Sequence, residues 1–187
     1  FKDYDEFLKE DLDGIVLCNY FNEHASFAIK AMEAGKAVLS ETTAAASLGE
    51  CIDLVEAKER TGGKYMLAAN CLYFPALHAM KPLLEEKKYG KILYAEGEYN
   101  HPADPYDGSW TKRYKFFEGH WRHHLPGSYY VTHSLGPIMW ATGATPRRVT
   151  AFNIFAPRPE AAPSASFNGD KAAVMMTQND DGSVFRF

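Results

Sequence analysis

A tyrosine and a histidine stand three residues apart in the segment 127–137, and their types and spacing suit proton transfer. Tyr130 and His133 lie where a loop runs into an apolar, helix-like stretch, with glycines on both sides. Histidine titrates near neutral pH, and groups that do so are effective general acids and bases. We predict that both residues are catalytic. A packed aromatic at Tyr130 and a capping or core histidine at His133 are the alternatives.

Composition limits the partners to be expected. The chain has 187 residues, of which 46% are hydrophobic and 24% charged, so it can bury a core in one or two domains. A net charge of -4 without a basic face argues against nucleic acid binding. No apolar run reaches the length of a membrane helix, and no signal-peptide pattern opens the chain. We expect neither nucleic acid nor a membrane as a partner.

The cysteines and clustered histidines do not form a metal-ligand pattern. Cys18, Cys51 and Cys71 have no zinc-type spacing, and their odd number does not suggest a disulfide framework. We predict buried free thiols and a reducing, cytoplasmic compartment. The three histidines of 120–124 lack accompanying carboxylates, so a loop surface is expected there and no metal site is predicted.

The first third of the chain alternates short apolar runs with helical patterns. The runs 14–18, 37–39 and 65–68 are typical of buried parallel strands, and helical spacing fills the segments between them. Strand, helix, strand, helix, strand in this order predicts parallel βαβ units with right-handed crossovers.

Helix ends are marked by specific residues. Asn22 is expected to cap the first of these helices, which Gly35 ends. Ser47 with Glu50 three residues later forms a capping box for the second helix, which ends near Gly62.

The pattern changes after residue 72, where we place a domain boundary. Alternating polarity replaces continuous apolar runs, which predicts a mostly antiparallel sheet. The expected elements are a helix from Pro75 to Gly90, strands over 92–99 and 149–155, a short helix ended by Gly143, a hairpin over 173–187, and loops over 102–128 and 157–169.

These features together resemble the Gfo/Idh/MocA family of dinucleotide-dependent oxidoreductases, whose members act mostly on sugars and related polyols. The segment 13–41 looks like the second half of that family's Rossmann domain, and the resemblance runs to about residue 155. It implies an α/β protein: half of a Rossmann domain without its glycine-rich turn over 1–72, then an α+β domain with a mostly antiparallel sheet over 73–187. It also implies substrate binding and dimerisation through the second domain, as a homo-oligomer joined by the C-terminal sheet.

Within the family, the chain looks most similar to the NAD-dependent glycoside hydrolase branch, typified by α-N-acetylgalactosaminidase. The segment 41–45 reads Glu-Thr-Thr-Ala-Ala, where most members have Glu-Lys-Pro. Asn70 followed by Tyr73, the segment 95–101 and the motif of 127–137 also resemble that branch.

The resemblance implies roles for further residues. In open parallel sheets, ligands bind at the carboxyl ends of the strands. The residues implied at the cofactor are Glu41, Asn70, Asn19 and His24, with helix capping as the alternative for Glu41 and His24. Tyr99 and His101 are implied to share proton transfer with His133 and Tyr130. Arg122, Trp121 and Tyr73 are implied to bind substrate.

Two departures from the family pattern affect the interpretation. Thr42 replaces the lysine that typical members use near the nicotinamide and the substrate hydroxyl. No G-x-G-x-x-G occurs anywhere in the chain. We therefore expect an internal fragment of a longer protein, and we expect the isolated chain to bind dinucleotide weakly, because the glycine turn receives the pyrophosphate.

The leading hypothesis is an NAD(P)-dependent oxidoreductase acting on a sugar or related polyol. The alternative is an NAD-dependent glycoside hydrolase that oxidises the sugar at C3, removes the C2 proton, expels the glycosidic oxygen, adds water and reduces the ketone again. A catalytically silent binding module is a third possibility. Thr42 favours the second and third hypotheses, and the choice between NAD and NADP stays open.

Overall fold

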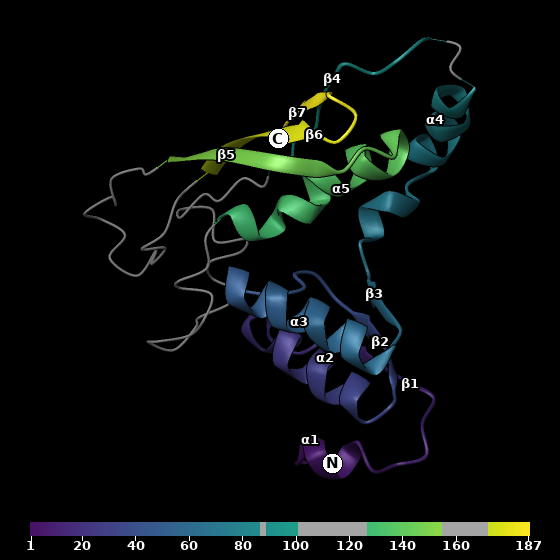
Figure 1. Ribbon diagram of the computed structural model, residues 1–187, viewed down its shortest axis with the longest axis vertical. Helices are drawn as coiled ribbons and strands as arrows, with labels where there is room; N and C mark the ends of the chain where they lie inside the picture. The colour runs from purple at the N-terminus through teal and green to yellow at the C-terminus, as the bar shows by residue number, and fades with distance from the viewer. Residues whose placement is uncertain (87–88, 101–126, 155–171) are drawn as a thin grey trace, which may run out of the picture. The chain divides into compact units, whose positions relative to one another are not determined.

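The computed structural model describes residues 1–86, 89–100, 127–154 and 172–187 (Figure 1). The chain divides into two compact units, Phe1–Ala69 and Asn70–Phe187. The roles predicted for two domains stay predictions. Most of the loops expected over 102–128 and 157–169 lies outside the described residues.

The first unit is built on a three-stranded parallel sheet. Its strands are β1 (Gly14–Leu17), β2 (Ala37–Ser40) and β3 (Tyr65–Leu67), in the order β1-β2-β3. Both pairings are parallel, with Ile15 opposite Val38. The helices α2 (His24–Glu33) and α3 (Leu48–Thr61) connect consecutive strands (Figure 1). The predicted βαβ order is confirmed, and all three strands end at the same edge of the sheet.

Alternate residues of these strands face two different surroundings. One face packs against the two connecting helices and forms the core. The buried members of this core are Ile15, Leu17, Ala28, Ala31, Met32, Val38, Leu54 and Ala57. On the other face, Val16, Leu39 and Met66 lie side by side in register and are exposed. The helices therefore cover one face of the sheet in the described part of the chain.

The start and end of α3 follow the sequence signals closely. Ser47 Oγ accepts a hydrogen bond from the Glu50 N–H (3.2 Å), as a capping residue should. The Glu50 carboxylate accepts from the Ala46 N–H (2.6 Å) instead of the Ser47 N–H, so the return bond of the capping box is shifted by one residue. Gly62 ends the helix with a positive φ of 65°.

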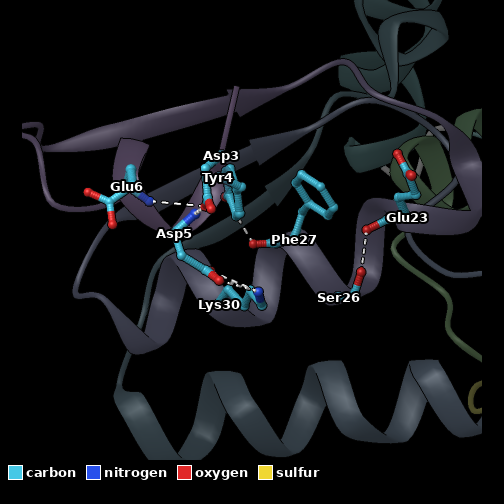
Figure 2. Close-up of polar contacts among 8 residues, drawn as sticks. All are labelled: Asp3, Tyr4, Asp5, Glu6, Glu23, Ser26, Phe27 and Lys30. Atoms are coloured by element: carbon cyan, nitrogen blue, oxygen red, sulfur yellow. Dashed lines mark hydrogen bonds and ion pairs between the residues drawn. The ribbon is translucent and has the colours of Figure 1, made fainter. Parts of the chain in front are cut away.

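The prediction that Asn22 caps the first helix was wrong. A short 3-10 helix, η1 (Phe21–Glu23), precedes α2, so Asn22 lies inside a helical turn and Glu23 takes the capping position without a side-chain bond. Ser26 Oγ donates to the Glu23 carbonyl (2.9 Å) (Figure 2). Gly35 has a φ of 76° just after α2, as expected from its position.

The prediction of buried thiols was wrong for two of the three cysteines. Cys71 is buried, but Cys18 and Cys51 are exposed. Cys18 comes directly after the last residue of β1, beyond the packed part of the strand. Cys51 lies on α3, whose buried residues are Leu54 and Ala57.

A one-turn helix at the N-terminus, α1 (Tyr4–Phe7), is attached to α2 by polar contacts (Figure 2). Tyr4 OH donates to the Phe27 carbonyl (3.0 Å), and the two rings are 4.3 Å apart between centroids. Lys30 Nζ lies 2.8 Å from the Asp5 carboxylate. Burial, with a smaller contribution from the Asp5 charge, raises the pKa of Tyr4 to about 12.

The second unit combines helices with a four-stranded sheet. Its helical elements are η2 (Asn70–Tyr73), α4 (Pro75–Glu85), η4 (Gly127–Tyr130) and α5 (Val131–Thr142). Its strands are β4 (Tyr94–Glu96), β5 (Pro146–Ile154), β6 (Ala172–Asn179) and β7 (Val184–Arg186). The order is β4-β7-β6-β5, with two antiparallel pairings and one parallel pairing between β4 and β7. The predicted mostly antiparallel sheet is confirmed.

The helix α5 covers one face of this sheet (Figure 1). Phe185 of β7 is fully buried against Ile138 of α5, together with Ala144. On the other face of the sheet, Phe152 and Met176 are exposed. The expected association of two copies through this sheet stays a prediction. Among the described residues, no helix has the length and apolar character needed to cross a lipid bilayer.

The contact between α1 and α2 should make stability sensitive to alkaline pH. A tyrosine has an ordinary pKa of about 10, so the unfolded chain loses the Tyr4 proton at lower pH than the folded chain does. The free energy of unfolding should therefore fall as pH rises from about 10 to about 12. Urea unfolding at several pH values should show a smaller fall for Tyr4→Phe than for the wild type. Tyr89→Phe, at an exposed site, is the control, and an unchanged fall in Tyr4→Phe would contradict the prediction.

Candidate active site

Three residues predicted to be catalytic come together in the second unit. Tyr99 follows β4, Tyr130 ends η4, and His133 lies in the first turn of α5. The Tyr99 and His133 rings meet edge to face with 4.7 Å between centroids, and the Tyr130 and His133 rings do so at 5.5 Å. The two tyrosine rings are 5.8 Å apart. We call Tyr99, Tyr130 and His133 the aromatic triad.

Gly97 makes this arrangement possible. A Cβ at this position would clash with the Ser134 carbonyl oxygen and would lie 2.8 Å from Ile138 Cδ1. The chain leaving β4 therefore passes against the backbone of α5 more closely than any other residue type allows. Two residues later, this path brings the Tyr99 ring to His133. The strand β4 spans Tyr94–Glu96 and is shorter than the predicted strand over 92–99, although the Gly97 N–H still donates to the Arg186 carbonyl (3.0 Å).

Burial raises the pKa of two acidic groups in and near the aromatic triad. It raises the pKa of the Tyr99 phenol, and the negative charges that Tyr130 and Cys71 would carry raise it further. Burial likewise raises the pKa of the Cys71 thiol. Thr132 Oγ1 lies 3.2 Å from His133 Nδ1, which fixes one side of the imidazole. At neutral pH the triad therefore pairs an imidazole with a protonated Tyr99 phenol.

Such a set of groups can move a proton and stabilise an oxyanion. An imidazole can take the proton of a substrate hydroxyl or of a carbon next to a ketone. A protonated phenol can donate a hydrogen bond to the oxygen on which negative charge develops. Tyr99 comes from the segment after β4, and Tyr130 and His133 come from the continuous helical segment of η4 and α5, so the triad joins two parts of the chain that are far apart in sequence.

The remaining residues predicted for catalysis and substrate binding are not among the three rings of the aromatic triad. His101, Trp121 and Arg122 lie outside the described residues, as do the histidines of 120–124. Tyr73 of η2 is exposed, and its ring stacks on His78 of α4 with 6.1 Å between centroids. Among the described residues, no group of three His, Cys, Asp or Glu side chains could hold a metal ion.

In the first unit, two residues predicted to bind the cofactor follow neighbouring strands. The Glu41 N–H, directly after β2, donates to the Leu17 carbonyl (2.9 Å), and the Glu41 side chain is exposed. Asn19 follows β1 and donates from Nδ2 to the Glu23 carboxylate (3.3 Å). Its Oδ1 atom is buried and has no hydrogen-bond partner in the described part of the chain. This edge thus holds a carboxylate and an unsatisfied acceptor, which suit the hydroxyl groups of a ribose.

His24 and Asn70, also predicted at the cofactor, have contrasting surroundings. His24 is fully buried. Its Nδ1 lies 2.7 Å from the Thr43 carbonyl oxygen, and its Nε2 lies 3.1 Å from the Asn19 carbonyl oxygen. Asn70 begins η2 in the second unit and is exposed. Direct roles for Glu41, Asn19, His24 and Asn70 in cofactor binding stay predictions.

Comparisons with known proteins identify sequence relatives. No family model matches the chain. It is 31% identical over 140 residues to an alpha-N-acetylgalactosaminidase of Bacteroides fragilis, covering 70% of this chain and 31% of that protein. It is 29% identical over 165 residues to a glycosyl hydrolase family 109 protein of Stenotrophomonas maltophilia, covering 79% of this chain and 36% of that protein. The chain thus spans about a third of the length of the curated relatives it matches.

Solved structures with the same fold extend over the whole chain. A scyllo-inositol dehydrogenase of Lactobacillus casei, solved with bound NAD(H) and scyllo-inositol, is 19% identical with a TM-score of 0.69, covering 100% of this chain and 53% of that one. An oxidoreductase domain protein of Kribbella flavida is 21% identical with a TM-score of 0.76, covering 100% of this chain and 50% of that one.

Similarity in fold and similarity in sequence together define the class of protein. In fold, the chain is similar to the Gfo/Idh/MocA oxidoreductases. In sequence, it is a relative of the glycosyl hydrolase family 109 proteins. The resemblance predicted from the sequence, to that family and to its glycoside hydrolase branch, is therefore confirmed.

Two residues important for the site's geometry were not identified as such from the sequence. Gly97 interrupts an otherwise alternating strand pattern, which is a signal for close backbone approach. Cys71 lies near enough to Tyr99 to affect the pKa of its phenol, although the two are distant in sequence. No local pattern could have paired them.

Adding a methyl group at Gly97 should push β4 away from α5 and displace Tyr99 from His133. We expect Gly97→Ala to lower the free energy of unfolding by about 1–3 kcal/mol, the usual cost of overpacking. Chemical denaturation measures this. Gly49→Ala is the matched control, because a Cβ there has no neighbour nearer than Ser47 Oγ at 3.8 Å and alanine favours the helix. Equal stability of Gly97→Ala and the wild type would contradict the close approach.

Proposed function

We propose that this chain is part of an NAD(P)-dependent enzyme that oxidises a hydroxyl-bearing carbon of a sugar-like substrate. The observation that carries the proposal is the aromatic triad, an imidazole in contact with two phenols on separately positioned elements. A related fold that binds NAD(H) and scyllo-inositol supports it.

The residues at the strand ends of the first unit fit a dinucleotide. Glu41 offers a carboxylate, and Asn19 Oδ1 is a buried acceptor without a partner among the described residues. Both can accept hydrogen bonds from ribose hydroxyls, which is the usual role of polar residues at this edge. Asn70 joins them in the proposal as a contact of the nicotinamide or its ribose. When bound, a nicotinamide cofactor supplies hydride transfer to and from the substrate carbon.

The triad supplies the accompanying proton transfers. His133 accepts the proton of the substrate hydroxyl as the carbon becomes a ketone. Tyr99 and Tyr130 donate hydrogen bonds to the oxygen while it carries negative charge. His101 shares this proton transfer, and Arg122, Trp121 and Tyr73 bind the substrate.

Net oxidation is the first form of the proposed reaction, and it ends with release of the ketone and the reduced cofactor. Glycoside hydrolysis is the second form and is favoured by the 31% identity to an alpha-N-acetylgalactosaminidase. In it, His133 removes the C2 proton next to the transient ketone, and the C2 electron pair expels the glycosidic oxygen. Water then adds to the resulting double bond, and hydride returns to C3, so that no net oxidation occurs.

We also propose a cytoplasmic location for the protein and association of two copies of the chain. All three cysteines are free, and two of them are exposed, which supports a reducing, cytoplasmic compartment. The exposed apolar residues of β5 and β6, among them Phe152 and Met176, support association of two copies through the C-terminal sheet.

Cofactor binding is tested by calorimetric titration of the full-length protein with NAD⁺ and NADP⁺. We expect the wild type to bind one of them and Glu41→Gln to bind it about tenfold more weakly, since a charged acceptor contributes more than a neutral one. Glu56→Gln, an exposed carboxylate on α3, is the control and should bind as the wild type does. Failure of the wild type to bind either dinucleotide would refute the proposal.

Loss of the His133 imidazole should abolish most of the catalysis. General acid–base groups contribute about 10²–10⁴-fold, so His133→Ala in the full-length enzyme should reduce turnover by roughly that factor while circular dichroism stays unchanged. The control is Glu59→Ala, which removes an exposed side chain of α3 outside the triad.

The product separates the two forms of the reaction. Net oxidation gives NADH absorbance in proportion to substrate consumed. Hydrolysis in deuterated water gives sugar labelled at C2 without net NADH, because the base exchanges its proton with solvent. Full activity of His133→Ala would remove this residue from the mechanism.

A further inference from the structure

The side chain of His24 joins two loops of the first unit that are far apart in sequence. It is fully buried at the start of α2. Its Nδ1 reaches the Thr43 carbonyl oxygen (2.7 Å), in the loop 41–47 after β2. Its Nε2 reaches the Asn19 carbonyl oxygen (3.1 Å), in the loop 18–20 after β1. One ring therefore spans the gap between the ends of two neighbouring parallel strands.

The chemistry of these contacts makes the ring a tether. Carbonyl oxygens only accept hydrogen bonds, so a ring nitrogen binds its carbonyl when it carries a proton. A neutral ring has one N–H and donates to one of the two carbonyls, whereas the doubly protonated ring donates to both. A partly buried carbonyl that loses a hydrogen bond loses part of its stabilisation, so both loops gain by staying at the distance that the ring sets. An apolar ring of the same size would fill the same volume and hold neither carbonyl.

The two tethered loops carry the residues proposed to bind the cofactor. Asn19 provides both a carbonyl held by His24 and the side-chain oxygen that lacks a partner. Glu41 lies two residues before Thr43, the other tethered residue. The spacing between the Asn19 side chain and the Glu41 carboxylate thus depends on a ring that does not itself reach the protein surface.

We propose that His24 is a positioning residue: it ties the loop after β1 to the loop after β2 and so sets the spacing of Asn19 and Glu41 for the dinucleotide. The proposal replaces the direct cofactor contact first expected of His24, and it rests on the proposed function for its consequence in binding. The tether itself is independent of any ligand.

Hydrogen–deuterium exchange of the full-length protein tests the tether without a cofactor. In His24→Phe, amide exchange should rise at least tenfold in both loops, 18–20 and 41–47, and should stay unchanged in β1 and β2. His24→Gln, which keeps a donor, should show a smaller rise. Ser26→Ala is the matched control, because it removes the bond from Ser26 Oγ to the Glu23 carbonyl at the same end of α2 without touching either loop (Figure 2).

A rise limited to 18–20, or one reproduced by Ser26→Ala, would overturn the proposal, because His24 would then only stabilise its own helix end. Should His24→Phe fail to fold, His24→Gln carries the same test, and its exchange in 41–47 must exceed that of Ser26→Ala.

NAD⁺ titration of the same variants measures the consequence. His24→Phe should bind about tenfold more weakly than the wild type, and Ser26→Ala should bind as the wild type does. Glu41→Gln should weaken binding without changing loop exchange, because it removes a contact and leaves the tether. If the wild type does not bind dinucleotide, the proposed function fails while the exchange result still decides the tether. If the loops loosen in His24→Phe and affinity does not change, the positioning role is refuted.

Discussion

The missing side chain at Gly97 is the constraint on which the geometry of the second unit depends. Only a glycine lets the chain leaving β4 pass this close to the Ser134 carbonyl on α5. Ile138 and Phe185 pack into the contact between helix and sheet and hold it in place. The aromatic triad is a consequence of this packing, because Tyr99 belongs to the strand side and His133 to the helix side. The three rings are thus positioned by the core and not by their own hydrogen bonds alone.

A different constraint organises the first unit. Parallel pairing brings the ends of β1 and β2 to one edge, but it leaves the conformation of the following loops undetermined. His24 supplies what the pairing does not, since its ring contacts the backbone of both loops. The first unit therefore fixes two loops through a buried polar side chain, whereas the second unit fixes three rings through close backbone approach.

The sequence predicted those features that depend on local patterns. The parallel strands, the Ser47 cap, the hairpin after β6 and the position of His133 at the start of a helix all followed from periodicity and capping rules. Asn22 was assigned wrongly because a 3-10 turn, which differs little from a helix start in sequence, came first.

The features that depend on distant segments were not predicted. The contact of Tyr99 with His133 joins residues separated by a long stretch of chain, and the tether from His24 ends on backbone carbonyls, which every residue has. Exposure of Cys18 and Cys51 likewise depends on which face each element turns to the core. Sequence patterns predict the local conformation of a segment, whereas these contacts and exposures depend on which distant segments pack against it.

The substitution at Thr42 affects how the chemistry must be divided among the residues. Thr42 stands where the Gfo/Idh/MocA pattern has a lysine, and a lysine can hold and release a proton. Thr42 is buried, and its hydroxyl does not titrate at physiological pH. In the proposed function, proton transfer is therefore assigned to His133, because histidine is the residue type of the aromatic triad that ordinarily titrates near neutrality. The phenol of Tyr99, with its pKa raised by burial, is a donor and not a base under these conditions.

A single imidazole that first takes a hydroxyl proton can next take a proton from the neighbouring carbon, provided that the first proton has passed to solvent. The proposed sequence of steps requires a proton path out of the triad, and the Thr132 hydroxyl, 3.2 Å from His133 Nδ1, is placed to be its first group.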